Sequence, residues 1–438
     1  MIGAPGLDLL KKTARPIQGS NLFMPRRNCE EARVCTGLER LAELGSELLA
    51  GKRVGLLAHA ASVTSDFRYA WDVLDSMPGV RLQALFSPEH GLMGTHQDQE
   101  SVSGPGVPAS FQGLPLYSLY GETAKSLRPR PEALADLDAL IVDLQDVGSR
   151  YYTFIYTLSH CMEACRDRDV EVWVLDRPNP LGGRKVEGSP LLPGFESFVG
   201  RYALPVRHGL TIGECAVVFR EVFGVRCRLR ILPMRGWRRS MWFDQTGLPW
   251  IAPSPNMPTL DTATVYPGTC LVEGTNLSEG RGTTRPFELV GAPWIDPRAL
   301  AAELRSRNLP GVFFRPVWFK PAFHKYAGRT CGGIQIHVLD RRTFFPFRTG
   351  VHLLEAVAGL WPESFRWRQE PYEFETVRPA IDLLAGGSWL REAIEGQRDL
   401  EACLSDGEAR ARKFQSKIKP LWLYPERFSA WTGLLTFF

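Results

Sequence analysis

The sequence has no feature typical of membrane-spanning, nucleic-acid-binding or common nucleotide-binding proteins. No run of roughly 20 apolar residues occurs in the 438-residue chain, so a transmembrane helix is not expected. The net charge is only +4, and lysines and arginines form no long cluster, which argues against a nucleic-acid groove. Neither a GxxxxGK[ST] loop nor a GxGxxG turn follows the first predicted strand, so the familiar nucleotide fingerprints are absent.

Cysteine and N-terminal patterns exclude two further classes. The nine cysteines form no pair of CxxC motifs, so neither a structural zinc site nor a disulfide framework is expected. The first residues lack a continuous apolar stretch behind a basic segment, so a signal peptide is not predicted. We therefore expect a cytoplasmic protein, with a periplasmic or secreted one as the alternative if the start site is misplaced. Residues 1–36 are predicted to be an N-terminal extension.

From residue 37 onwards, predicted strands and helices alternate. Apolar runs predict strands at 53–60, 80–87, 138–144, 170–176 and 227–232, and helical segments at 37–52, 64–77, 151–166 and 211–223. This alternation predicts a parallel sheet covered by helices on both faces. The chain is also too long for one ordinary core, so two domains are expected.

One long segment, residues 253–294, combines glycines and prolines with carboxylates, amides and arginines, and shows no helical or strand period. Long irregular segments of this composition are usually binding or catalytic loops. Glu273 and Glu279, followed by Arg281 and Arg285, favour a site for a polar, anionic substrate. A polar surface loop is the alternative.

Polar residues also follow four of the predicted strands. They are His59, the segment 87–91, the segment 143–153 and the segment 176–180. Ligands of open α/β sheets bind outside the carboxyl ends of the strands, so these residues predict a site along that edge. Each of them alone could simply cap the next helix.

Several long motifs resemble one family. SPEHG (87–91), LQDVGSRYYT (144–153), LDRPNPLGG (175–183), PVRHGLTIGE (205–214), PSPNMPT (253–259) and the segment 266–294 are similar to the exo-β-N-acetylmuramidases of the NamZ type, formerly a domain of unknown function. The resemblance runs from about residue 37 to about residue 425. It implies a Rossmann-like, doubly wound parallel sheet over 37–232. It also implies a second, smaller α+β domain over 233–438, which contributes the loop 253–294 to a cleft between the two.

The same resemblance implies a glycosidase that releases N-acetylmuramic acid from the non-reducing ends of peptidoglycan fragments during cell-wall turnover or recycling. Muropeptides or MurNAc-GlcNAc would be the substrates, and no cofactor, metal ion or nucleic acid is expected. Two alternatives stay open: a non-catalytic muropeptide-binding or cell-wall-binding protein, and a Rossmann-type enzyme with another small-molecule substrate.

Glycoside hydrolysis needs a general acid and stabilisation of an oxocarbenium-like transition state. Glu89, at the end of a predicted strand, is the expected acid, and His90 is expected to orient it or to contact the sugar. The alternative for Glu89 is a carboxylate satisfied at a helix N-terminus. Glu273 and Glu279 are the candidates for the second carboxylate, with Asp143 and Asp146 as alternatives.

Muramic acid carries a lactyl carboxylate, and a guanidinium pairs with such a group in a bidentate manner. Arg150 and Arg281 are therefore candidate readers of this group, together with Arg285. Their alternative role is a salt bridge within the protein, such as Arg281 with Glu279. Hydroxyl and acetamido contacts are expected from Tyr152, Asn179, His208, Asn256 and Asn276.

Overall fold

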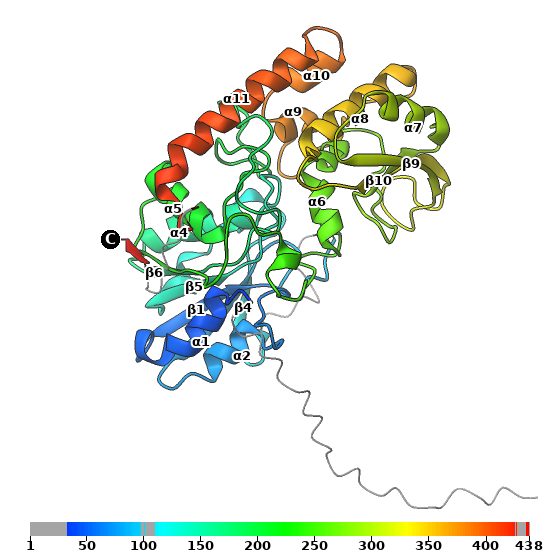
Figure 1. Cartoon of the computed structure of the whole chain (residues 1–438). Coiled ribbons are helices and arrows are strands. Elements are labelled where there is room, and N and C mark those ends of the chain that lie inside the picture. The colour runs from blue at the N-terminus through cyan, green and yellow to red at the C-terminus, as the bar shows by residue number, and fades with distance from the viewer. Residues whose placement is uncertain (1–32, 98–99, 101–109, 425, 427–434, 438) are drawn as a thin grey trace, which may run out of the picture.

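The computed structural model describes residues 33–97, 100, 110–424, 426 and 435–437, and Figure 1 shows two domains of unequal size. The larger domain contains an eight-stranded sheet in the order β11-β7-β6-β5-β1-β2-β4-β3. Its six central strands are parallel: β1 (Arg53–Ala58), β2 (Arg81–Ser87), β4 (Leu114–Ser118), β5 (Ala139–Asp143), β6 (Glu171–Leu175) and β7 (Leu229–Leu232). The edge strands β3 (Ser110–Phe111) and β11 (Leu435–Phe437) are antiparallel. The predicted α/β class with a doubly wound parallel sheet is confirmed.

Both faces of this sheet are covered, because successive strand residues point to opposite sides. In β1, Val54 and Leu56 pack in one hydrophobic cluster, whereas Leu57 packs in the other. Helices α1 (Gly37–Leu48) and α2 (Ala70–Asp75) cover the first face, and α4 (Phe154–Arg166) and α5 (Ile212–Glu221) cover the second. The near-continuous apolar runs of the sequence follow from this burial on two sides.

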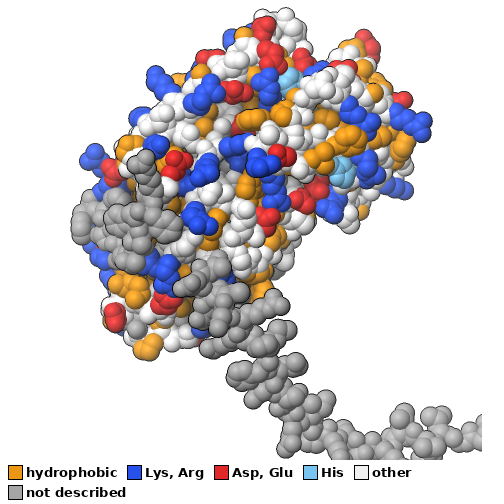
Figure 2. Space-filling model, in the orientation of Figure 1, with side chains coloured by type: hydrophobic (Ala, Val, Ile, Leu, Met, Phe, Trp, Pro, Cys, Tyr) orange, Lys and Arg blue, Asp and Glu red, His pale blue; other side chains and the backbone are white. Residues whose placement is uncertain are grey.

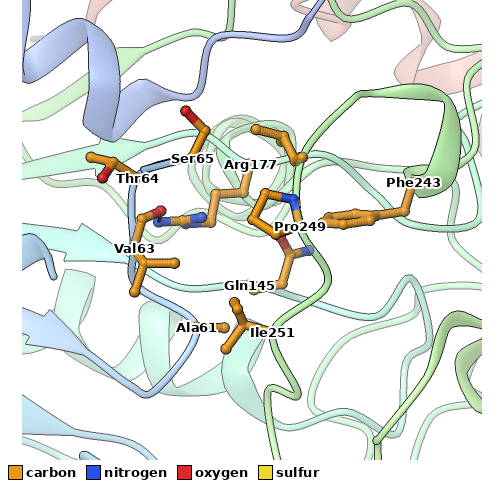
Figure 3. Close-up of a pocket in the computed structure, with 10 residues that line it drawn as sticks. Ala61, Val63, Thr64, Ser65, Gln145, Arg177, Phe243, Pro249 and Ile251 are labelled. Atoms are coloured by element: carbon orange, nitrogen blue, oxygen red, sulfur yellow. Dashed lines mark hydrogen bonds between the residues drawn. The ribbon is translucent and has the colours of Figure 1, made fainter. Parts of the chain in front are cut away.

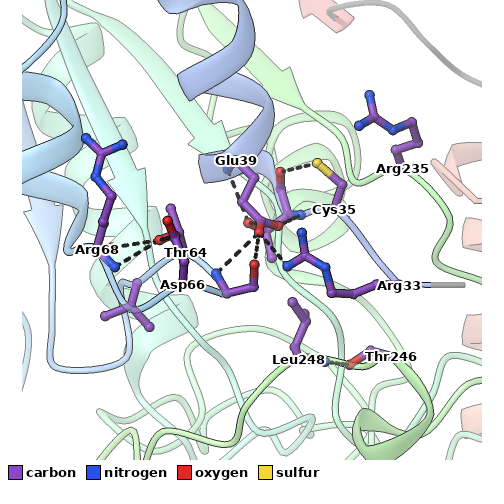
Figure 4. Close-up of polar contacts among 12 residues, drawn as sticks. Arg33, Cys35, Glu39, Thr64, Asp66, Arg68, Arg235, Thr246 and Leu248 are labelled. Atoms are coloured by element: carbon purple, nitrogen blue, oxygen red, sulfur yellow. Dashed lines mark hydrogen bonds and ion pairs between the residues drawn. The ribbon is translucent and has the colours of Figure 1, made fainter. Parts of the chain in front are cut away.

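Helix α1 begins with a capping box that also anchors the loop after β1 (Figure 4). The Thr36 hydroxyl accepts a hydrogen bond from the backbone N–H of Glu39 (3.3 Å), and the Glu39 carboxylate accepts one from the N–H of Thr36 (2.8 Å). Ser65 and Arg33 donate to the other Glu39 oxygen at 2.6 and 2.7 Å. Residues 1–32 of the predicted extension lie outside the described residues.

The helix expected over 64–77 is much shorter than predicted, since α2 spans only Ala70–Asp75. Ser62 and Thr64 cause the difference by binding the backbone locally. The Ser62 hydroxyl accepts from the N–H of His59 (2.9 Å), and the Thr64 hydroxyl accepts from the N–H of Arg68 (3.0 Å). Such contacts compete with helical hydrogen bonds, so the chain forms a loop before α2 starts.

The smaller domain combines an antiparallel sheet with helices, as the predicted α+β class requires. The sheet order is β8-β10-β9, with β8 (Leu289–Ala292), β9 (Val312–Phe319) and β10 (Cys331–Val338). The helices are α6 (Leu260–Thr269), α7 (Pro297–Ser306), α8 (Pro346–Leu360), α9 (Ala380–Ala385), α10 (Trp389–Ile394) and α11 (Leu400–Ile418). Helix α11 runs back toward the larger domain (Figure 1). Strand β11 lies within 233–438, the range predicted for the smaller domain, and it pairs with β7 of the larger domain.

The prediction that no regular structure occurs in 253–294 is wrong. This segment contains α6, the 3₁₀ helix η3 (Cys270–Gly274) and β8. Apart from Asp261, every residue of α6 is buried, so the helix has no polar face and hence no detectable period. Gly268 makes this burial possible, because a Cβ there would lie 1.9 Å from the Pro346 carbonyl oxygen of α8.

Further short helices connect these elements: η1 (Ala124–Leu127), α3 (Pro131–Leu134), η2 (Phe243–Gln245) and η4 (Lys419–Leu421). Of the helices in the described part of the chain, none combines the length and the apolarity that crossing a membrane requires. In the face seen in Figure 2, cationic and anionic side chains are interspersed among apolar and neutral ones.

Candidate active site

A pocket lies where both domains contribute side chains, with about 490 Å³ of empty space counted out into the open solvent. From the larger domain come the turn after β2 and the residues that precede α4. From the smaller domain come η3 and the segments around residues 281 and 372. Six of the predicted site residues line this cavity: Glu89, His90, Tyr152, Asn256, Glu273 and Arg281. The structure thus brings together residues that are far apart in the sequence.

The turn after β2 presents Glu89 to the cavity. His90 and Gly91 both adopt left-handed backbone conformations, with φ of 70° and 79°. A non-glycine residue in this region is uncommon and costs about 1–2 kcal/mol, and such outliers cluster at functional sites. Glu89 is 7% exposed, and the Thr153 hydroxyl donates to its Oε2 at 2.8 Å. His90 Nδ1 lies 2.9 Å from the His96 carbonyl oxygen, so Nδ1 carries a proton and Nε2 remains for other contacts.

Glu273 lies on η3 and has several strong hydrogen-bond donors. Arg281 donates to its Oε1 at 2.8 Å, and the Tyr372 hydroxyl donates to its Oε2 at 2.6 Å. Arg281 also donates to Glu279 at 3.0 Å. Arg281 therefore bridges two carboxylates and holds Glu273 at the cavity wall in a fixed orientation. The predicted Arg281–Glu279 salt bridge is present.

Glu279, the other predicted catalytic carboxylate, does not line the cavity. It is fully buried and contacts Lys325 (3.1 Å), Arg281 (3.0 Å) and His324 (3.3 Å). Burial alone raises the pKa of Glu279, but the surrounding cations, Lys325 first, lower it to about 2. Glu279 is therefore an ionised anchor for Lys325, Arg281 and His324, and it has no proton to donate at neutral pH.

Arg150 likewise lies away from the cavity. It is fully buried, and its guanidinium donates to the carbonyl oxygens of Ser189 (2.8 Å), Leu204 (2.9 Å) and Leu384 (2.7 Å). These three carbonyls belong to distant parts of the chain, so Arg150 connects segments of the protein. Of the three arginines predicted to read a carboxylate, only Arg281 lines the cavity. Arg285 pairs with Glu288 at 3.2 Å.

Two predicted contacts from the larger domain, Asn179 and His208, also lie outside the cavity. The Asn179 amide donates to the Leu210 carbonyl oxygen at 2.8 Å, and its side-chain oxygen accepts from the N–H of Leu181 at 2.9 Å. His208 Nδ1 accepts from the N–H of Leu210 at 3.1 Å. Both side chains therefore fix loops at the carboxyl edge of the sheet.

Asn276, predicted as a contact from the smaller domain, faces another region. Its amide donates to the Ser364 carbonyl oxygen at 2.9 Å, and its side-chain oxygen accepts from the N–H of Arg366 at 3.0 Å. The alternative carboxylates Asp143 and Asp146 do not line the cavity either. Asp143 forms a buried bidentate pair with Arg177 (2.5 and 2.8 Å).

Other cavity residues were not predicted as site residues. They are Tyr151, Thr153, Val199, Ser254, Met257, Tyr266, Phe287, Tyr372 and Glu373. The hydroxyl of Tyr151 is buried and has no hydrogen-bond partner among the described residues, and such groups in proteins usually require one. Tyr372 and Glu373 come from a region without a strand-end or loop signal. Only the alternation of aromatic and acidic residues in 370–375 could have indicated them.

A separate pocket lies at the ends of β1, β5 and β6 (Figure 3), with about 300 Å³ of empty space counted out into the open solvent. The chain reverses its direction across the sheet between β1 and β5, and Rossmann-type proteins bind nucleotides at such a point. Here the crevice is lined by Phe243, Pro249 and Ile251, and Arg177 in its wall is paired with Asp143. This cavity therefore offers apolar surface and an already neutralised cation.

Among the described residues, no three His, Cys, Asp or Glu side chains are grouped as metal ligands. In the Glu89 cavity, Glu273 forms an ion pair with Arg281 and accepts a hydrogen bond from Tyr372. This arrangement is suited to acid–base chemistry on a polar substrate by the protein's own side chains.

Comparison with known proteins identifies the family. The model for the N-terminal part of exo-beta-N-acetylmuramidase NamZ matches residues 54–261, and the model for its C-terminal part matches residues 264–424. The chain belongs to the NamZ family. It is 42% identical over 398 residues to the peptidoglycan beta-N-acetylmuramidase NamZ of Bacillus subtilis (strain 168), with 91% of this chain and 93% of that protein covered.

Two solved structures share this fold. A DUF1343 family protein of Bacteroides fragilis is 34% identical, with a TM-score of 0.81, and 90% of this chain and 99% of that chain are covered. A second DUF1343 family protein of the same organism is 26% identical, with a TM-score of 0.68 and the same coverage. The two-domain architecture of this NamZ family member is therefore shared with experimentally determined structures.

Proposed function

We propose that this protein is an exo-β-N-acetylmuramidase that hydrolyses the glycosidic bond of a muramic acid residue at the non-reducing end of peptidoglycan fragments. The observation that carries the proposal is the cavity between the domains. It combines Glu89 and His90 from the larger domain with Glu273 and Arg281 from the smaller one, in a chain that matches both NamZ family models.

Glu89 is proposed as the general acid. A carboxyl group that is nearly buried and oriented by a hydrogen bond from Thr153 (2.8 Å) can hold its proton toward a leaving oxygen. His90, which follows it in a left-handed conformation, is proposed to contact the substrate through Nε2. Proton donation by a positioned side chain contributes about 10²–10⁴-fold to such reactions.

Glu273 is proposed as the carboxylate that stabilises the positive charge of the oxocarbenium-like transition state. Its ion pair with Arg281 and its hydrogen bond from Tyr372 fix its position, so little reorganisation accompanies the reaction. Arg281 is proposed to donate to the lactyl carboxylate of muramic acid as well, because a guanidinium carries five N–H groups.

The test is hydrolysis of a chromogenic N-acetylmuramide beside the matching N-acetylglucosaminide. We expect release of N-acetylmuramic acid with a strong preference for the muramide, since a site built to pair a charge discriminates against an analogue without it. Equal rates on both sugars would leave only a broader hexosaminidase. No turnover of either sugar would refute the proposed function.

A further inference from the structure

Lys325 does not line the Glu89 cavity, but it contacts the charged residues behind the cavity wall. It belongs to the loop 320–330 between β9 and β10, and it lines a different pocket of the smaller domain. Its ammonium group donates to the Glu279 carboxylate at 3.1 Å and to the Val272 carbonyl oxygen at 3.3 Å. Val272 directly precedes Glu273 in η3. Lys325 can therefore act on the cavity only through other residues.

The backbone of this loop holds Lys325 in place. The two residues that adjoin it, His324 and Tyr326, both adopt left-handed conformations, with φ of 67° and 59°. Non-glycine residues rarely do so, and such outliers cluster at functional sites. The N–H of Ala322 donates to the carbonyl oxygen of Gly282 at 2.8 Å, so the loop is also attached to the residue that follows Arg281.

Two buried carboxylates share a single guanidinium nitrogen. Arg281 donates from the same Nη1 to Glu273 at 2.8 Å and to Glu279 at 3.0 Å. One positive charge does not compensate two negative ones, and a buried charge without compensation is costly. Lys325 brings a second permanent positive charge to Glu279. His324 Nδ1, 3.3 Å from Glu279, adds a charge only when it is protonated.

Resting on the proposed function, we propose that Lys325 is a positioning residue for the reaction. By compensating Glu279, it keeps the Arg281 guanidinium oriented toward Glu273 and toward the carboxylate of a muramic acid ring. Without Lys325, Glu279 and Glu273 compete for Arg281, and one of them takes up a proton at a pH at which both are otherwise ionised. A protonated Glu273 cannot stabilise an oxocarbenium-like transition state, so hydrolysis slows as pH falls.

Other titratable groups also lie near these carboxylates. Burial raises the pKa of one thiol and three phenols around Glu273 well above their ordinary values, so they are neutral in the acid range; they are Cys270, Tyr151, Tyr266 and Tyr372. Glu89, His90 and Glu373 share the cavity, and Arg366, Arg368 and Glu370 line the pocket of Lys325. The variants below change none of these groups, so the effect of Lys325 can be separated from theirs.

The test is the pH dependence of kcat on the disaccharide MurNAc-GlcNAc, because this profile reports groups in the enzyme–substrate complex. Lys325→Met removes the charge and keeps a long side chain. The acid limb of its profile should move to higher pH by about one unit, as for the loss of a nearby opposite charge, so that kcat on this limb falls about tenfold. Lys325→Arg keeps the charge and should retain the original profile.

A double variant shows whether the effect passes through Glu279. Lys325→Met combined with Glu279→Gln removes one charge of each sign, so its acid limb should return to the position found in the unmutated protein. A merely structural loss would lower kcat at every pH and would not be reversed in this way. Lys52→Met is the matched control, because Lys52 forms a similar ion pair with Glu171 (3.2 Å) in the larger domain; its profile should be unchanged.

An acid limb that stays in place in Lys325→Met would overturn the proposal, as would one that stays displaced in the double variant. If Lys325→Met does not fold, as its melting temperature will show, Glu279→Gln decides the question. Arg281 and Lys325 then face one carboxylate, so the limb should move to lower pH, and an unmoved limb would contradict the coupling. Failure of the proposed function is recognised separately, because the unmutated protein would then hydrolyse the disaccharide at no pH.

Discussion

Replacing Glu89 by glutamine tests the proposed mechanism most directly. The substitution keeps the size of the side chain, and the amide oxygen can still accept the 2.8 Å hydrogen bond from Thr153. Only the transferable proton is lost. Glu89 is 7% exposed, so bulk water has little access to act as a substitute acid. We therefore expect loss of nearly the full general-acid contribution, about 10²–10⁴-fold in kcat, or about 2.7–5.4 kcal/mol of activation free energy.

The leaving group determines how much of this loss appears. The disaccharide MurNAc-GlcNAc releases a poor leaving group that needs protonation, so kcat in Glu89→Gln should fall by the full factor. A 2,4-dinitrophenyl muramide releases a stable phenolate, so its hydrolysis should fall much less. The two rates are measured by release of N-acetylmuramic acid and by absorbance, respectively, and compared between the variant and the unmutated protein.

Glu132→Gln is the matched control, because it makes the same chemical change at an exposed position of helix α3. Its rates on both substrates should equal those of the unmutated protein. Near-normal hydrolysis of the disaccharide by Glu89→Gln would refute the role of Glu89 as the acid. An equal loss on both substrates would assign Glu89 to binding or to structure, and Glu373 would become the next carboxyl group to examine.

Three further predictions follow from the contacts of the site and the core. Arg281→Ala should erode the preference for muramide over glucosaminide by roughly ten- to hundredfold, as for a lost charge-assisted hydrogen bond. Arg150→Ala removes contacts to three carbonyls, so it should lower the melting temperature without changing the ratio of kcat/KM on the two sugars. The same loss of preference in both variants would contradict the assignment of Arg281. Burial raises the pKa of Glu187 from 4.5 to about 7. Between these two pH values the folded protein therefore holds a proton that the unfolded chain releases. As a result, the free energy of unfolding should fall as pH rises from about 4.5 to about 7. The free energy of unfolding is measured by denaturant titration at several pH values, and in Glu187→Gln its decline with pH should be smaller by a few kcal/mol. The same pH dependence in the variant and the unmutated protein would show that Glu187 is ionised in the folded state. Finally, a chelator should leave hydrolysis unchanged, and loss of activity restored by zinc or manganese would point to a metal-dependent reaction instead.

The positions of these strands along the chain and the covered faces of the sheet could be predicted from the sequence because they depend on local patterns. The buried runs in β1, β5 and β6 contain few polar residues, and a parallel strand covered on both sides requires such a run. Two local errors share one cause. The loop before α2 forms because Ser62 and Thr64 bind the backbone, and α6 lacks a period because it is buried on nearly all sides. In both cases the hydrogen bonds or the burial of the segment, and not its hydrophobic periodicity, determine its secondary structure.

The sequence by itself determined which kinds of residue the site contains. The turn 87–91, the segment 151–153 and the segment 253–294 each carry side chains suited to sugar chemistry, and their motifs indicate the family. Glu89, His90, Glu273 and Arg281 were predicted in this way, and all four line one cavity.

Only the tertiary structure decided which of these side chains face the cavity. Arg150 and Arg281 have the same chemistry, as do Glu273 and Glu279. In each pair, the surrounding residues place one side chain at the cavity and the other away from it. Arg150 is enclosed by three carbonyl oxygens, and Glu279 by Lys325, Arg281 and His324, whereas Arg281 and Glu273 line the cavity. The physical reason is that a charged side chain in the interior must have its charge compensated nearby. Which charges are used for that compensation depends on residues distant in the sequence, and folding alone brings them together.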